Sequence, residues 1–213
     1  MPWLYLSGGK AFPSEARLSY PTPAHLERIN IQPGERRASA KPVLLSTLLG
    51  SCVAVCLYDE KTGIAGLNHF LLAAPRYAKD MPMTHTEAGR YGINAMELLI
   101  NDMVGLGASR QRLKAKAFGG ATVIGGARDN FFCVHEVNQR FIREYLGTEG
   151  IPLVAEDLGG DRGRLVYFHT DTFQVFRRYI QRSQLGRIEE DERLFWKAKV
   201  EKPEAEEGNV ILF

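Results

Sequence analysis

Residues 43–58, VLLSTLLGSCVAVCLY, contain two short apolar runs separated by a glycine and a serine. Runs of this length that are rich in β-branched and apolar residues are typical of buried strands. A polar turn sequence, DEKTG, follows at 59–63, and a further apolar run occupies 64–72. The pattern predicts a β-hairpin whose returning strand carries His69 alongside the strand that begins at Cys52.

Helices and further strands are predicted on the C-terminal side of this hairpin. Apolar residues at helical spacing predict one helix over 90–104, ended by Gly105 and Gly107, and a second from Val134 to a stop at Gly147. Strands are predicted at 113–117, 151–155, 164–169 and 173–177, the first with a solvent-facing side formed by Lys114 and Lys116. Helices that cover a mostly antiparallel sheet give an α+β fold class.

Three regions differ in composition. Residues 1–41 hold five of the ten prolines and few apolar runs, which predicts an extended N-terminal arm. Residues 42–180, with the predicted strands and helices, form the predicted core domain. Residues 181–213 are dominated by charges and end in an apolar tip, 210–213, a pattern that resembles a docking peptide.

Composition excludes several classes of function. The 27 Lys and Arg residues barely outnumber the 25 Asp and Glu residues, so neither nucleic acid nor an anionic membrane is an expected partner. No apolar run is long enough to span a bilayer, and the N-terminus lacks the pattern of a secretory signal. The three cysteines are too few for a disulfide framework. A cytoplasmic protein with free thiols is expected.

Cys52 is the strongest candidate for chemistry. A thiolate is a strong nucleophile, and it becomes useful beside a histidine that takes its proton, the role available to His69 across the hairpin. Gly50 and Ser51 precede the cysteine and allow a sharp turn whose amides could stabilise an oxyanion. A small cysteine that merely packs at the start of a strand is the structural alternative.

Other candidate sites are weaker. Cys56 and Cys133 are predicted to be core residues, and three cysteines without a CxxC motif do not indicate a zinc site. The glycines at 119 and 120 lack the lysine of a phosphate-binding loop, so they are interpreted as a tight passage near the active site. No metal or cofactor is expected.

The chain resembles the CheD family of chemoreceptor glutamine deamidases over about residues 30–178. The segments that carry the resemblance are LLGSCVAVCLYD at 48–59, LNHF at 67–70, RYG at 90–92, AMELL at 95–99, KAFGGA at 116–121 and VAEDLGG at 154–160.

The resemblance implies a cytoplasmic protein-glutamine glutaminase that hydrolyses receptor glutamine amides to glutamate through a Cys52 thioester, with His69 as base. Hydrolysis of receptor methyl esters is implied in some members. The implied fold is a sandwich of β-sheets flanked by helices, similar to bacterial toxin glutamine deamidases. The implied partners are methyl-accepting chemotaxis receptors and a CheC-like phosphatase. A non-catalytic adaptor that binds the same partners is the alternative.

The resemblance also implies a hydroxyl residue that orients His69. Ser46 lies six residues before the nucleophile, and strand alternation would place it on the face of Cys52. A break in phase at the Gly50 turn would favour its neighbour Thr47 instead. Asn68, Gly119 and Gly120, within the matching segments, are expected near the substrate.

Overall fold

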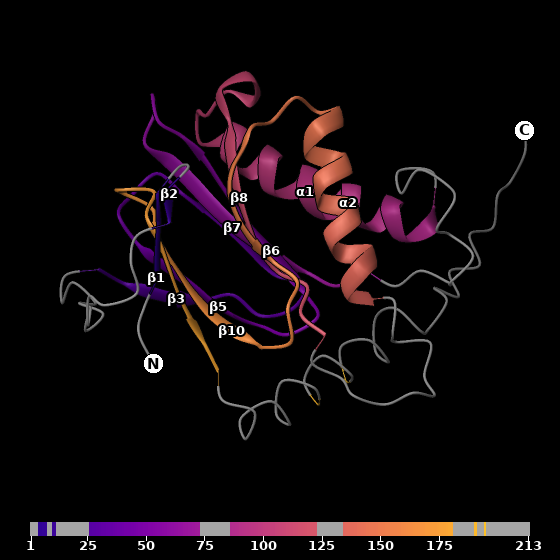
Figure 1. Ribbon diagram of the computed structural model, residues 1–213. Helices are drawn as coiled ribbons and strands as arrows, with labels where there is room; N and C mark the ends of the chain where they lie inside the picture. Colours follow the sequence, from indigo (N-terminus) through magenta and orange to yellow (C-terminus); the bar gives the residue numbers. More distant parts are fainter. Residues whose placement is uncertain are drawn as a thin grey trace, which may run out of the picture.

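The computed structural model describes residues 4–7, 10–11, 26–72, 86–122 and 134–180, together with residues 190 and 194. Within these ranges two β-sheets pack face to face, and helices α1 and α2 cover the outer face of one sheet (Figure 1). The arrangement of two sheets and few helices agrees with the predicted α+β class.

One sheet has six strands in the order β2-β1-β11-β10-β5-β3, antiparallel except for the β3–β5 pair. Its strands are β1 (Leu4–Ser7), β2 (Lys10–Ala11), β3 (Arg28–Asn30), β5 (Leu44–Leu49), β10 (Arg164–His169) and β11 (Val175–Tyr179).

The other sheet has five strands in the order β4-β7-β6-β8-β9, with a parallel β8–β9 pair. Its strands are β4 (Arg36–Ser39), β6 (Val53–Asp59), β7 (Ile64–Phe70), β8 (Lys114–Gly119) and β9 (Leu153–Leu158). The predicted hairpin is confirmed as β6 and β7, whose turn is closed by hydrogen bonds from the Thr62 and Gly63 amides to the Asp59 carbonyl.

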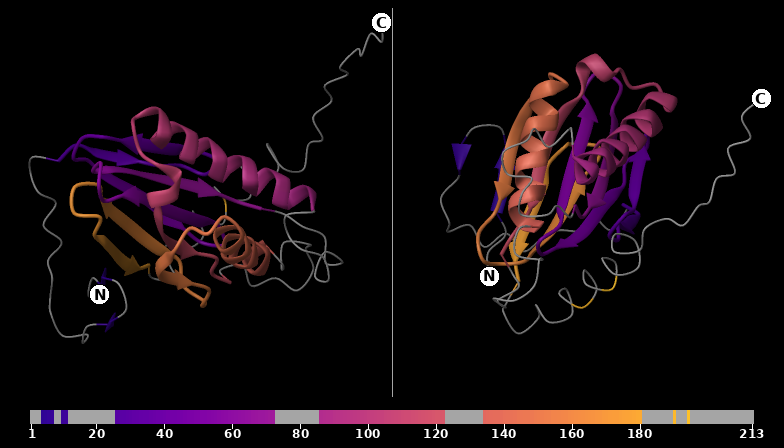
Figure 2. Two further views of the ribbon diagram at one scale, coloured as in Figure 1. Left: turned by 90° about the horizontal axis from the view of Figure 1, so that it is seen from above. Right: turned by 90° about the vertical axis from the view of Figure 1, so that its right-hand side faces the viewer.

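The helices are α1 (Glu87–Gly105) and α2 (Val134–Thr148), and a short 3-10 helix, η3 (Arg110–Arg112), leads into β8. The Thr86 hydroxyl caps α1 by accepting a hydrogen bond from the Gly89 amide, so this helix starts three residues before the predicted position. Figure 2 (left) shows α1 along its length and α2 nearly end-on, so the two helices cross steeply.

Alternate residues of β6 supply two apolar cores. Val53, Val55 and Leu57 face the helices, whereas Ala54, Cys56 and Tyr58 fill the space between the sheets. Strand β6, which lies in the middle of the five-stranded sheet, is therefore buried on both faces. This explains its nearly continuous apolar sequence.

The solvent-facing side predicted for β8 is wrong at Lys116. This side chain is 5% exposed, and its ammonium donates a hydrogen bond to the Phe173 carbonyl, 2.6 Å away. The second sheet covers the face that alternation alone assigned to water, and the carbonyl offsets part of the cost of burying the charge.

The segment predicted as an extended arm contributes strands to both sheets. Residues 28–30 pair with β5, and residues 36–39 pair with the edge of β7. Edge strands expose much of their surface and need few apolar side chains, so their composition resembles that of an arm. The proposed domain boundaries stay a prediction.

Two predictions concern residues that the structure does not describe. The tail at 181–213, with its apolar tip, and Cys133 lie outside the described residues apart from positions 190 and 194. Within the described part of the chain, neither helix has the length and apolar character that crossing a membrane requires.

Candidate active site

Cys52 lies at the crossover between the two sheets. Strand β5 belongs to the six-stranded sheet and ends at Leu49, whereas β6 belongs to the five-stranded sheet and begins at Val53. Residues 50–52 connect them, and the Cys52 side chain is fully buried in the core between the sheets. The turn that carries the cysteine is thus anchored on both sides.

His69 shares this inter-sheet face. It pairs with Ala54 across the β6–β7 ladder, and directly opposite residues in a ladder point to the same side. Ala54 and Cys52 both belong to the inter-sheet core. The imidazole therefore faces the same inter-sheet core that contains the Cys52 side chain.

Hydrogen bonds define the tautomer of His69. Its Nδ1 lies 2.8 Å from the Thr47 hydroxyl oxygen, and the same hydroxyl donates to the Ile31 carbonyl, also at 2.8 Å. A hydroxyl has one proton, so with that proton given to Ile31 it accepts the hydrogen bond from Nδ1–H. The lone pair then resides on Nε2, which is buried and without a hydrogen-bond partner among the described residues.

Burial keeps this imidazole neutral. Loss of solvent lowers the pKa of His69 from 6.5 to about 4, and the nearby Ile31 carbonyl opposes the shift in part because its partial negative charge favours the protonated ring. At neutral pH the ring therefore presents an unprotonated Nε2, the form that a general base requires.

Of the two candidate hydroxyls, Thr47 contacts His69 and Ser46 does not. Ser46 bonds instead with Arg28 Nε at 3.1 Å and with the Asn30 side chain at 3.3 Å. If side chains alternated between the two faces without interruption from Ser46 to Cys52, Ser46 would share the face of Cys52. The crossover at 50–52 interrupts this alternation, because β5 and β6 belong to different sheets. Thr47 consequently shares the inter-sheet face with Leu45 and Leu49.

Gly119 and Gly120 hold the cysteine turn from the end of β8. The Gly120 amide donates to the Cys52 carbonyl at 2.7 Å, and the Ala121 amide donates to the Gly50 carbonyl at 2.8 Å. Gly119 has φ 113°, and a Cβ there would lie 2.1 Å from the Cys52 carbonyl oxygen. These glycines allow the close approach predicted for them, and they contact the backbone of the turn.

Asn138 is a buried residue of α2 that sequence analysis did not assign to the site. Its amide nitrogen donates to the Ser51 carbonyl at 3.1 Å, and its oxygen accepts from the Leu72 amide at 2.8 Å. It thereby links the cysteine turn to the chain that follows β7. The sequence did hold a sign of this role, because Asn138 is a polar residue among the apolar residues on the inward face of the predicted helix.

Asn68 and Cys56 occupy structural positions. The Asn68 side chain accepts from the Val55 amide and donates to the Ala95 carbonyl, so it joins β7 to β6 and α1. Cys56 is fully buried as predicted, and burial raises the pKa of its thiol far above the ordinary value. Among the described residues no three His, Cys, Asp or Glu side chains are grouped to hold a metal ion.

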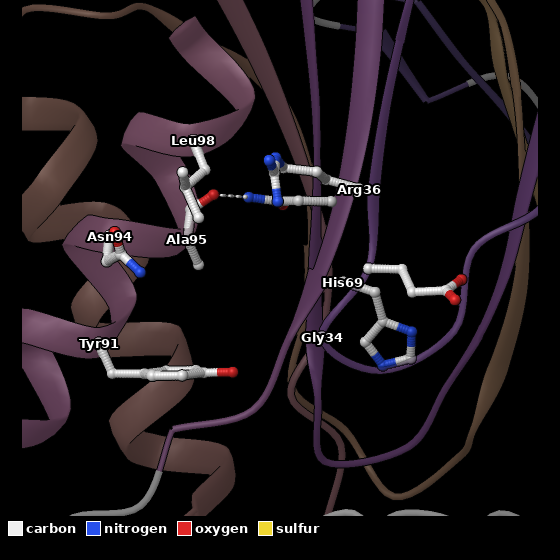
Figure 3. A pocket seen from close by; sticks show the side chains of 9 residues that line it. Gly34, Arg36, His69, Tyr91, Asn94, Ala95 and Leu98 are labelled. Atoms are coloured by element: carbon white, nitrogen blue, oxygen red, sulfur yellow. Dashed lines mark hydrogen bonds between the residues drawn. The ribbon is translucent and has the colours of Figure 1, made fainter. Parts of the chain in front are cut away.

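A small pocket opens beside His69, between α1 and strands β4 and β7 (Figure 3). Its strand side is formed by Gly34, Glu35, Arg36, Asn68 and His69, and its helix side by Tyr91, Asn94, Ala95 and Leu98.

Comparison with known proteins finds the same family over most of the chain. A model of the family described as CheD chemotactic sensory transduction matches residues 73–179. A probable chemoreceptor glutamine deamidase CheD 1 of Geobacter sulfurreducens is 48% identical over 87% of this chain and 93% of its own length. A probable chemoreceptor glutamine deamidase CheD 2 of Chromobacterium violaceum is 50% identical over 73% of this chain and 75% of its own length.

We expect Gly119→Ala to destabilise the fold by more than about 3 kcal/mol, because it combines a strained backbone conformation with a clash against the cysteine turn. Gly63→Ala is the matched control, since Gly63 has φ 74° but no atom within 4 Å of an added Cβ. The control should cost about 1–2 kcal/mol from the backbone alone. Urea unfolding measures both, and equal losses would contradict the close approach at Gly119.

We expect stability to fall as the pH drops from about 6.5 toward 4. In this window the unfolded chain, with a His69 pKa near 6.5, binds a proton that the folded chain, with a pKa of about 4, does not. The loss approaches about 3 kcal/mol at pH 4, and the contribution is constant above pH 6.5. Urea unfolding from pH 4 to 8 should show a weaker dependence in His69→Gln. An unchanged dependence would refute the neutral buried imidazole.

Proposed function

Because the chain belongs to the CheD family, we propose that it is a chemoreceptor glutamine deamidase, a hydrolase that converts receptor glutamine side chains to glutamate and releases ammonia. The relatives named as probable chemoreceptor glutamine deamidases support the substrate class. One structural observation supports the chemistry above all others. A neutral imidazole is held at Nδ1 by Thr47, its Nε2 has no hydrogen-bond partner among the residues that the structure describes, and it faces the core that contains a buried thiol.

The first half of the proposed reaction forms a thioester. His69 Nε2 takes the proton of the Cys52 thiol, and the sulfur attacks the carboxamide carbon as the C=O π electrons move to oxygen. The tetrahedral oxyanion then collapses and the C–N bond breaks. His69 returns its proton to the leaving nitrogen, which departs as ammonia.

The second half consumes water. Nε2 takes a proton from a water molecule, and the water oxygen attacks the thioester carbon. Collapse of this second oxyanion breaks the C–S bond, and His69 returns the proton to sulfur. One water enters, one ammonia leaves, and the glutamine has become glutamate with the enzyme restored.

Thr47 orients the base in this scheme. By accepting from Nδ1–H, its hydroxyl fixes both the tautomer and the plane of the ring. The amides of Gly50 and Ser51, at the turn beside the sulfur, are proposed donors to the oxyanion. The same acyl-transfer site would accept a receptor glutamyl methyl ester, with methanol as the leaving group.

The wider setting is also a proposal. The partners would be the cytoplasmic domains of methyl-accepting chemotaxis receptors, and a CheC-like phosphatase would be a second partner. The two-sheet architecture with helices on one face supports similarity to the bacterial toxin glutamine deamidases. The adaptor alternative predicts receptor binding without turnover.

Incubation with a receptor cytoplasmic fragment should convert specific glutamines to glutamates, detected by peptide mass spectrometry and by ammonia release. Cys52→Ala should abolish conversion, because it removes the sulfur that forms the proposed thioester. Binding without conversion by the wild-type protein would favour the adaptor, and conversion that persists in Cys52→Ala would exclude the proposed mechanism.

Thr47→Val should lower kcat about threefold to tenfold, which corresponds to the loss of one neutral hydrogen bond to the base. Ser46→Ala is the matched comparison, since it removes the neighbouring hydroxyl, which does not contact His69. Steady-state ammonia release measures both. A larger loss in Ser46→Ala than in Thr47→Val would assign the orienting role to Ser46.

A further inference from the structure

The β6–β7 ladder ends next to the proposed nucleophile, at the pair of Val53 and Phe70. The same register continued by two residues would place Ser51 opposite Leu72. Successive carbonyls of an extended chain face opposite neighbours, and the Cys52 carbonyl faces β8, so the Ser51 carbonyl is directed to the β7 side. A continued ladder would therefore bond the Leu72 amide directly to the Ser51 carbonyl.

Asn138 of α2 occupies the place of that bond. Its Oδ1 accepts from the Leu72 amide at 2.8 Å, and its Nδ2 donates to the Ser51 carbonyl at 3.1 Å. One direct bond is thus replaced by two bonds through a carboxamide, which holds the two main chains apart by its own width. The side chain has no exposed surface, so bulk water does not compete for either bond.

The next residue of α2 contacts the segment on the other side of the turn. Gln139 Nε2 donates to the Gly120 carbonyl at 2.8 Å, and the Gly120 amide donates to the Cys52 carbonyl. The helix is itself anchored by Phe141 and Ile142, which are fully buried in the core between the helices and the sheet. Adjacent residues of one anchored helix therefore hold the cysteine turn and the end of β8 that supports it.

The carboxamide determines how far the turn lies from β7. His69 lies on β7, shortly before Leu72, and Cys52 directly follows Ser51. If Ser51 and Leu72 bonded directly, the ladder would lengthen by one pair and draw the cysteine turn toward β7. Cys52 would then shift relative to the imidazole. A misplacement of about 1 Å in an active site can cost about 100-fold in rate.

We propose that Asn138 is a positioning residue for the deamidation reaction, and that its carboxamide sets the place of Cys52 relative to His69. This inference rests on the deamidase function proposed above. Asn138 acts through the main chain of Ser51 and Leu72, and it neither gains nor loses a proton in the reaction. Its removal should therefore slow the chemical step more than it weakens substrate binding.

Asn138→Ala removes both bonds and lets Ser51 and Leu72 approach each other. We expect kcat for deamidation of a receptor fragment to fall about 10-fold to 100-fold, with less than about a threefold change in KM. The assay is run at a temperature at which circular dichroism shows the variant to be folded. A wild-type kcat in this variant would overturn the proposal.

Leu146→Ala is the matched control for a loss of stability. Leu146 is 1% exposed and lies two turns further along α2, about 12 Å from Asn138, so its truncation leaves a cavity under the same helix and keeps both bonds. We expect its thermal unfolding midpoint to fall while kcat stays within about twofold of the wild type. An equal loss of kcat in both variants would mean that α2 contributes only stability, and it would overturn the proposal.

Asn138→Asp tests the hydrogen bonds themselves. A protonated carboxyl group keeps the pattern of the carboxamide, because its hydroxyl donates to the Ser51 carbonyl and its other oxygen accepts from the Leu72 amide. An ionised carboxylate cannot donate, and it repels the Ser51 carbonyl. Burial raises the pKa of such a carboxyl group well above the ordinary value of about 3.9, so we expect this variant to lose activity as the pH rises.

The ratio of kcat in Asn138→Asp to kcat in the wild type is measured from about pH 5 to 9. Groups that titrate in both proteins, such as His69 and His135, cancel in this ratio. We expect a ratio within about threefold of one at the acid end, and a fall of at least about tenfold toward the alkaline end. A ratio that does not change with pH would overturn the proposal, and this test decides the question if Asn138→Ala does not fold.

The proposed function and this inference fail in different ways. If wild-type protein does not convert receptor glutamine, the deamidase function is refuted. If the wild type is active and Cys52→Ala is inactive, while Asn138→Ala matches the wild type, the function stands and only the inference is refuted.

Discussion

The hydrogen bond from the Gly120 amide to the Cys52 carbonyl fixes the point where the chain passes from one sheet to the other. Strand β5 lies in one sheet and β6 in the next, so the crossover has no ladder of its own along residues 50–52. The end of β8 supplies the missing partners, and Gly119 makes this possible because any Cβ would strike the carbonyl. The orientation of the proposed nucleophile depends on this contact between two backbone segments.

A buried arginine supports the same contact from behind. Arg164 is fully buried and donates to the carbonyls of Asp157 and Gly159. The Gly159 amide in turn donates to the Gly119 carbonyl at 2.9 Å. A charge is costly to bury unless it is paired, and here Asp157 also supplies the carboxylate. The loop after β9, the end of β8 and the cysteine turn thus form one connected network.

Burial has opposite consequences for the two groups of the proposed dyad. It keeps His69 neutral, which supplies the free base, and Thr47 directs the ring without adding the charge that a carboxylate would bring. It also removes Cys52 from solvent, so the substrate must be guided to the sulfur.

The sequence by itself determined the β6–β7 hairpin that carries His69 and the family, because these depend on short-range alternation and on motifs of residues close in the chain. It did not decide whether Ser46 or Thr47 contacts His69. Side chains alternate between faces only within one strand, and the crossover between the sheets interrupts that alternation. It misplaced Lys116, because only the packing of the second sheet shows which face of β8 is covered. The pocket, too, required the tertiary structure, since α1 and β7 meet there only through packing.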